Sequence, residues 1–215
     1  MEHGEPIGEG YFKKVYADSE NPEKRIHAEF KMPLTNEQIK SAFYLNKIAH
    51  LLFPENIPEI HLAANERGDD PFATWHDRTG YLKADRVSTD ETHDKLQTLH
   101  KKYFQEELTA EGDESERLLQ EEISKKPEVK TFVSLAKASG LNIDSAGQNF
   151  SLKDGVVKYL ELNPAWLKRN HEFYPSIYFD KEKLSAAIDK LPEDKKELAK
   201  TYFERLVSLC GNLLE

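Results

Sequence analysis

Cysteine is nearly absent from this chain, and other common signals are missing altogether. The single cysteine, Cys210, excludes an internal disulfide and any metal site built from several cysteines. The histidines are scattered without an H-x-x-x-H pair, so the sequence does not predict a zinc site. No apolar run approaches the roughly 18 residues of a membrane span. The first ten residues lack the basic start and apolar core of a secretory signal. We therefore expect a cytoplasmic protein.

Negative charge exceeds positive charge, with 39 acidic and 30 basic residues and a net charge of −9. A protein of this charge is not expected to bind nucleic acid or an anionic membrane through its overall field. If it binds a phosphate group, it must do so with local basic side chains and backbone N–H groups. The 215 residues are enough for one domain, or for two lobes that share a core.

The first motif covers residues 7–16, with the sequence IGEGYFKKVY. Two glycines lie between apolar residues, which predicts a strand, a turn and a second strand. Glycines at such a bend allow backbone N–H groups to approach an anion closely. A G-x-G pair by itself is more often part of a simple surface hairpin, and both interpretations stay open.

Further strands and one helix are predicted after this motif. In residues 25–32 the apolar residues alternate, with Ile26, Ala28 and Phe30 on one face and Lys31 on the other. Lys31 therefore lies either in solvent or in a cleft. The pattern then predicts a helix over residues 35–52 and strands over residues 59–64, 72–75 and 81–87.

The most informative stretch is residues 141–166. Two apolar runs flank Asp154-Gly155, which predicts a hairpin because this pair suits a tight primed turn. Asp144 and Asn149 precede the hairpin, and Glu161 follows it. Two carboxylates and an amide are oxygen ligands suited to Mg²⁺ bound to a phosphate. The alternative is that all three are turn residues, since Asp and Asn favour turns for local hydrogen-bonding reasons.

The rest of the chain is predicted to be helical. A helix that begins at residues 89–91 is interrupted at Gly112, and a short charged helix covers residues 114–126. Pro127 opens another helix that ends at Gly140. Closing helices are predicted over residues 181–190 and 192–214. The buried side of the helix after Pro127 is expected to carry Val129, Phe132, Val133, Leu135 and Ala136.

These motifs, in this order, resemble the protein kinase-like superfamily. Its small lobe is matched by Gly8-x-Gly10-x-Phe12-x-x-Val15, a lysine-bearing strand at Lys31, a helix and further strands. Asp144-x-x-x-x-Asn149 has the spacing of the family's catalytic loop, and Glu161 falls where the family has its metal-binding Asp. The resemblance covers roughly residues 5–166 and is closer to aminoglycoside-phosphotransferase-like and other atypical members than to ordinary protein kinases.

The resemblance implies an α+β, two-lobed fold. Residues 1–88 would form a small lobe of antiparallel strands with one helix, and residues 89–215 a reduced, mainly helical lobe, together one unit. It also implies a role for each matching residue. ATP would be bound by Gly8, Gly10, Phe12, Val15, Lys31, Asp85 and Val87, Mg²⁺ by Asn149 and Glu161, and catalysis would use Asp144 and Lys31.

The implied activity is transfer of a phosphoryl group from ATP, with Mg²⁺, to a hydroxyl of a small molecule or protein. Three departures from the family pattern suggest an alternative. Lys13 replaces the third glycine, Asn142-Ile143 replaces the usual His-Arg, and Glu161 replaces Asp. The alternative is a pseudokinase-like module that binds a nucleotide or a protein without catalysis. A third possibility is an interaction protein whose acidic helices around residues 106–122 bind a basic partner.

Overall fold

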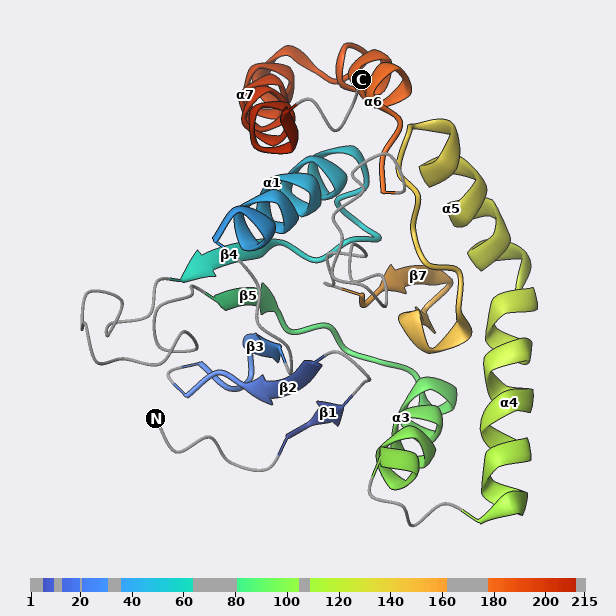
Figure 1. The fold of residues 1–215 in the computed structure, drawn as a ribbon. Helices are drawn as coiled ribbons and strands as arrows, with labels where there is room; N and C mark the ends of the chain where they lie inside the picture. Colours follow the sequence, from blue (N-terminus) through green and yellow to red (C-terminus); the bar gives the residue numbers. More distant parts are fainter. Residues whose placement is uncertain are drawn as a thin grey trace.

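The computed structural model describes residues 6–9, 13–19, 21–30, 36–63, 81–104, 109–161 and 178–211. Within these ranges the chain is a mixed α+β fold, as the sequence predicts, with two antiparallel sheets among helices (Figure 1). The strands are β1 (Gly8–Glu9), β2 (Lys13–Ala17), β3 (Arg25–Phe30), β4 (Ile60–Ala63), β5 (Tyr81–Asp85), β6 (Phe150–Lys153) and β7 (Val156–Tyr159). The helices are α1 (Asn36–Leu52), α3 (Glu91–Phe104), α4 (Ala110–Lys125), α5 (Pro127–Ala138), α6 (Lys181–Ile188) and α7 (Glu193–Cys210), with a 3₁₀ turn at Gly147–Asn149.

The first five strands form one antiparallel sheet in the order β1-β2-β3-β5-β4. Ile26 lies opposite Ala84, and Ala84 lies opposite Ile60 on the neighbouring strand. Side chains paired in this way share one face of a sheet, so small and branched apolar residues form a continuous buried surface. Ala84 and Ile60 have no exposed surface. The strand predicted over residues 72–75 falls outside the described residues.

Helix α1 packs between this sheet and the last helix, α7 (Figure 1). Its buried apolar side chains include Ile39, Ala42, Ile48 and Ala49. On the α7 side, the ring of Tyr202 lies 6.1 Å from that of Phe43 and 6.0 Å from that of Tyr44. The C-terminal part of the chain therefore covers a helix that precedes it by about 150 residues.

Helix α4 differs from the sequence prediction. We expected Gly112 to interrupt the helical region, but α4 runs from Ala110 to Lys125 and includes Gly112. Thr109 is the N-cap, and its side chain accepts a hydrogen bond from the Gly112 N–H at 3.2 Å. The prediction was wrong because a glycine in the first turn bonds to the cap and not to a preceding helical carbonyl.

Helix α5 begins at Pro127 and is followed by Gly140 in the left-handed conformation, with φ of 84°. Both features match the prediction. Val129, Phe132 and Ala136 are buried, but Leu135 is 54% exposed. Placing Leu135 on the buried side was wrong, because it lies six residues after Val129 and therefore about 120° around the helix from it.

The hairpin of β6 and β7 has the predicted two-residue turn. Asp154 and Gly155 have φ values of 53° and 77°, and Lys153 pairs with Val156 on either side of them. Positive φ at both central residues defines the primed turn that suits the twist of the strands. Asp-Gly meets this requirement because Gly has no Cβ and Asp tolerates the left-handed region.

Both edges of this hairpin are bonded to other parts of the chain. On the β7 side, Tyr159 N donates to Asn56 O at 2.8 Å, and Asn56 Nδ2 donates to Val157 O at 2.9 Å. On the β6 side, Leu152 N donates to Asp90 Oδ2 at 2.7 Å, and Asp90 N donates to Ser151 Oγ at 2.9 Å. The hairpin thus connects the loop after α1 with the segment that leads into α3.

None of the helices in the described ranges combines the length and the apolar character needed to cross a bilayer.

Candidate functional site

The loop that carries Asp144 starts at a fixed point at the end of α5. Leu141 forms an isolated antiparallel bridge with Phe179, and Asn142 N donates to Tyr178 O at 2.9 Å. A Cβ on Gly140 would lie 2.5 Å from the Leu184 backbone nitrogen, so only glycine fits where the loop passes α6. These contacts hold the first residues of the loop against the segment that precedes α6.

Asp144 itself is exposed, but its backbone N–H and one of its carboxylate oxygens are both hydrogen-bonded. Its N–H donates to the hydroxyl of Tyr159 at 3.1 Å, and its Oδ1 accepts from Ala146 N at 3.0 Å. The second bond is the local turn that Asp commonly forms with its own backbone two residues on. The turn interpretation and the catalytic interpretation therefore coexist at Asp144, since one carboxylate oxygen is used locally.

Asn149 is 4% exposed and joins the Asp144 loop to the hairpin. Its carbonyl accepts a hydrogen bond from Leu160 N at 2.8 Å, which extends the β6–β7 pairing by one residue pair. Its Nδ2 lies 3.5 Å from the carbonyl oxygen of Asp144. Asn149 therefore lies next to Leu160, the residue that precedes Glu161.

Tyr159 is hydrogen-bonded to the Asp144 loop and precedes Glu161 by two residues. Burial raises its pKa well above the usual value, and the negative charges of Glu161 and Asp144 raise this pKa further, while the hydrogen bond from the Asp144 backbone opposes them. The hydrogen bond from the Asp144 N–H to the Tyr159 hydroxyl and the bond from Leu160 N to Asn149 O place the Asp144 loop at the open end of the hairpin. The structure thus brings Asp144 and Asn149 to the end of the strand that leads to Glu161.

The structure describes only some of the candidate residues on and next to the five-stranded sheet. Gly8 on β1 pairs with Val15 on β2, and α3 contacts both β1 and the 3₁₀ turn that contains Asn149. Asp85 ends β5 opposite Arg25, and Val87 is half-buried in the segment that leads to α3. The remaining predicted residues of this group lie outside the described residues: Gly10, Phe12 and Lys31.

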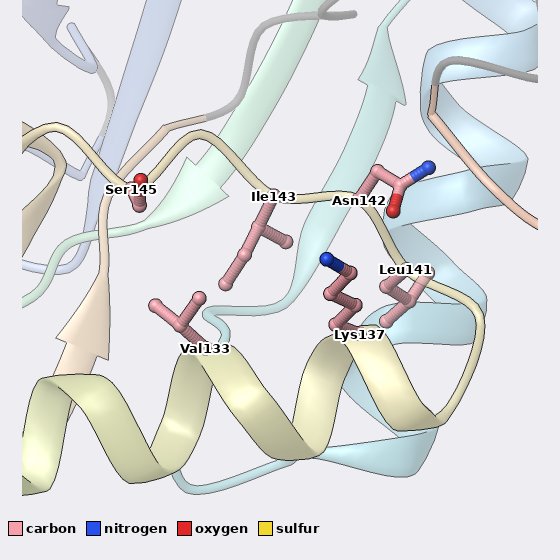
Figure 2. A pocket seen from close by; sticks show the side chains of 6 residues that line it. All are labelled: Val133, Lys137, Leu141, Asn142, Ile143 and Ser145. Atoms are coloured by element: carbon pink, nitrogen blue, oxygen red, sulfur yellow. The ribbon is translucent and has the colours of Figure 1, made fainter.

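A pocket of about 210 Å³ lies between α5 and the loop before Asp144 (Figure 2). Figure 2 shows Val133 and Lys137 rising from α5 toward Ile143 on the loop. The lining residues are Val133, Lys137, Leu141, Asn142, Ile143 and Ser145. Asp144 is not among them although both its neighbours are, so this pocket is separate from the group formed by Asp144, Asn149 and Glu161.

Sequence reasoning missed Tyr159 and Asp90. Tyr159 was assigned only to an apolar run, and nothing in that run indicates that its hydroxyl bonds to a backbone 15 residues away. Asp90 was placed at a helix start, and its N-cap bond to His93 N at 2.7 Å agrees with that position. Its second bond, to the hairpin, requires the two segments to be adjacent in space and carries no local signal.

Comparison with known proteins found no matching family model, no similar curated protein and no similar solved structure. The interpretation of the site therefore depends on its own geometry and chemistry. No cluster of three or more His, Cys, Asp or Glu side chains suited to a metal ion occurs within the described ranges. An ion at this site would need amide and substrate oxygens in addition to carboxylates.

Proposed function

We propose that the chain is a kinase-like phosphotransferase that moves the γ-phosphoryl group of ATP to a hydroxyl of a small molecule or protein. The observation that carries the proposal is that the Asp144 loop and Asn149 lie at the open end of the β6–β7 hairpin, at the strand end that leads to Glu161. A carboxylate on an exposed loop, next to a buried amide and a second carboxylate, suits proton transfer beside a cation-bound phosphate.

The order of elements supports a two-lobed arrangement for this function. One helix, α1, lies between β3 and β4, and the five-stranded sheet leads through residues 86–90 to the helices and the hairpin. In the proposed arrangement ATP lies between the β1–β2 turn and the Asp144 loop. Gly8, Gly10 and Lys31 contact its phosphates, and the segment from Asp85 to Val87 faces the base.

The oxygen donors at this site fit a Mg²⁺ ion that is coordinated by both protein and nucleotide. Mg²⁺ prefers oxygen ligands and is commonly held by one or two protein groups plus substrate phosphates and water. Asn149 and Glu161 provide an amide and a carboxylate, and the neighbouring Gln148 has a buried Oε1 without a hydrogen-bond partner in the described residues. When bound, the ion would neutralise phosphate charge.

In the proposed step, the acceptor oxygen forms a bond to the γ-phosphorus while the bond from that phosphorus to the β–γ bridging oxygen breaks. The acceptor hydroxyl gives its proton to the Asp144 carboxylate, and ADP leaves with the bond electrons. Asp144 is suited to this role because its side chain is exposed while its backbone is held by Tyr159. Positioning is the main protein contribution in phosphoryl transfer.

The competing candidate is a pseudokinase-like module that binds nucleotide without turnover. It is favoured by Asn142 and Ile143, which precede Asp144 where the kinase-like superfamily has His-Arg. In this case the same nucleotide contacts exist, but no phosphoryl product forms.

A thermal-shift titration with ATP, with and without Mg²⁺, tests the binding part of the proposal. A ligand that binds only the native state adds about 2.7 kcal/mol of stability at a hundred times its Kd. We expect a Mg²⁺-dependent rise in melting temperature with millimolar ATP, and no shift would contradict the site. Incubating the protein and γ-labelled ATP with a cell extract then separates the two candidates. A labelled product supports transfer, and binding without product supports the pseudokinase-like module.

A further inference from the structure

Tyr159 has a buried ring and a hydroxyl that reaches the Asp144 loop. The side chain is 7% exposed, and its ring centroid lies 5.3 Å from that of Phe150 and 6.3 Å from that of Phe132. Its backbone N–H donates to Asn56 O at 2.8 Å, so the strand at this residue is also held from the α1 side. The ring position is therefore determined by packing and by backbone pairing, independently of the hydroxyl.

The hydroxyl connects two segments that each carry an acidic residue. Asp144 N–H donates to it at 3.1 Å, and two residues beyond Tyr159 the chain reaches Glu161. Because the aromatic ring is fixed, its hydroxyl has little freedom to move. The hydrogen bond therefore fixes the distance between the Asp144 backbone and strand β7. The bond from Ala146 N to Asp144 Oδ1 lies within the loop and cannot do this.

We propose that Tyr159 is a positioning residue that sets the location of Asp144 relative to Glu161 through the hydrogen bond from the Asp144 N–H to its hydroxyl. The inference rests on the proposed function, in which Asp144 accepts the hydroxyl proton of the acceptor. Tyr159 contacts neither substrate in this scheme and acts through the loop backbone.

The ring and the hydroxyl have separable roles, which makes the inference testable. Tyr159→Phe keeps the contacts with Phe132 and Phe150 and removes only the acceptor of the Asp144 N–H. The control is Tyr202→Phe, which removes a hydroxyl from the α1–α7 contact, on elements remote from the loop. Both full-length variants are compared with the wild type by amide hydrogen exchange, by denaturant unfolding and by phosphoryl-transfer kinetics.

We expect the Asp144 amide to exchange about five times faster in Tyr159→Phe, which corresponds to loss of one hydrogen bond of ordinary net strength. The amides of β6 and β7 should keep their wild-type rates, which shows that the hairpin is intact. A small displacement of a catalytic group lowers turnover by up to about a hundredfold. We therefore expect kcat to fall by about tenfold or more, with KM for ATP unchanged. Tyr202→Phe should change neither quantity.

The outcomes separate this inference from the proposed function. An unchanged exchange rate at Asp144 in Tyr159→Phe overturns the inference, whatever the activity of the protein. Faster exchange with unchanged kcat also overturns it, because the bond would then hold the loop without positioning the carboxylate for transfer. If the wild type transfers no phosphoryl group, the proposed function fails, and the exchange rate alone decides whether Tyr159 sets the position of Asp144.

Discussion

The backbone of Gly147, in the loop after Asp144, lies directly against the backbone of Gln120 in α4. A Cβ on Gly147 would be 2.8 Å from the Gln120 Cα and closer still to the Gln120 carbonyl oxygen. Helix α4 is held in turn by α3, where His100 Nδ1 lies 2.6 Å from Glu116 Oε1. The loop of the candidate site therefore packs against α4, a helix that carries none of the site residues.

Replacing Gly147 with alanine should displace the loop from α4. Crowding by an added group in a packed interior costs about 1–3 kcal/mol, and a clash with backbone atoms belongs at the upper end. We expect the free energy of unfolding to fall by about 3 kcal/mol in denaturant titration. Gly155→Ala is the control, since a Cβ there meets nothing within 4 Å and the cost is limited to the left-handed backbone. Equal decreases in the free energy of unfolding for both variants would show that the loop moves away from α4 at no cost and would contradict this prediction.

Removing the carboxylate of Asp90 should cost more than removing an ordinary helix cap. Asp90→Ala loses the bond to His93 N, about 1 kcal/mol, and leaves Leu152 N–H without its acceptor, about 1–3 kcal/mol more. The matched control is Asp180→Ala, which removes the N-cap of α6, where Asp180 accepts from Lys183 N. Chemical denaturation of both variants measures the difference. Similar losses would mean that the Asp90–Leu152 bond adds nothing.

The buried His93 should make the protein less stable in mild acid. Burial lowers the pKa of His93, although its bond to Phe150 O and the nearby Asp90 and Asp94 oppose this shift. The unfolded state therefore binds a proton more readily, so stability is lost as the pH falls below about 6.5, the ordinary histidine value. In His93→Asn, an amide nitrogen can replace Nδ1 without titrating. The unfolding free energy of this variant should decline less between pH 7.5 and pH 5, and parallel declines would rule out His93 as the cause.

Replacing the two acidic residues of the candidate site should impair different properties, turnover in one case and Mg²⁺·ATP binding in the other. Asp144→Asn keeps the shape of the loop and should retain Mg²⁺·ATP binding while turnover is lost. Glu161→Gln removes an anionic oxygen ligand and should weaken the Mg²⁺-dependent part of ATP binding itself. Calorimetric titration and product assays measure these effects, with Glu182→Gln on α6 as an exposed control. Wild-type Mg²⁺·ATP binding by Glu161→Gln would mean that the hairpin end holds no metal.

Glu161→Asp completes this series. It restores the residue usual at this position in the kinase-like superfamily, but its side chain is one methylene shorter. Because Glu161 follows a strand whose register is set by the Asp154-Gly155 turn, the backbone would stay in place and the carboxylate would lie closer to it. We expect Mg²⁺·ATP binding between that of the wild type and that of Glu161→Gln. Binding equal to or better than wild type would show that the longer side chain has no role in positioning.

Much of the secondary structure could be predicted because its signals are local. Pro127 marks the start of α5, and Asp154-Gly155 defines the hairpin, since each depends on backbone preferences of one or two residues. Gly112 was misread for the opposite reason. Its effect depends on whether Thr109 caps the helix, and composition alone does not decide between an interruption and a first turn.

For the candidate site, the sequence by itself determined which chemical groups occur and in what order: Asp144, Asn149, a tight hairpin and Glu161. The tertiary structure decided that Asp144 and Asn149 lie at the strand end that leads to Glu161, through the Asn149–Leu160 bond and the Tyr159 hydroxyl. It also decided that α4 supports the loop at Gly147 and that α7 covers α1. These are contacts between residues distant in the chain, and no local preference encodes them. They follow from burying several apolar faces at once, a condition that only the complete fold satisfies.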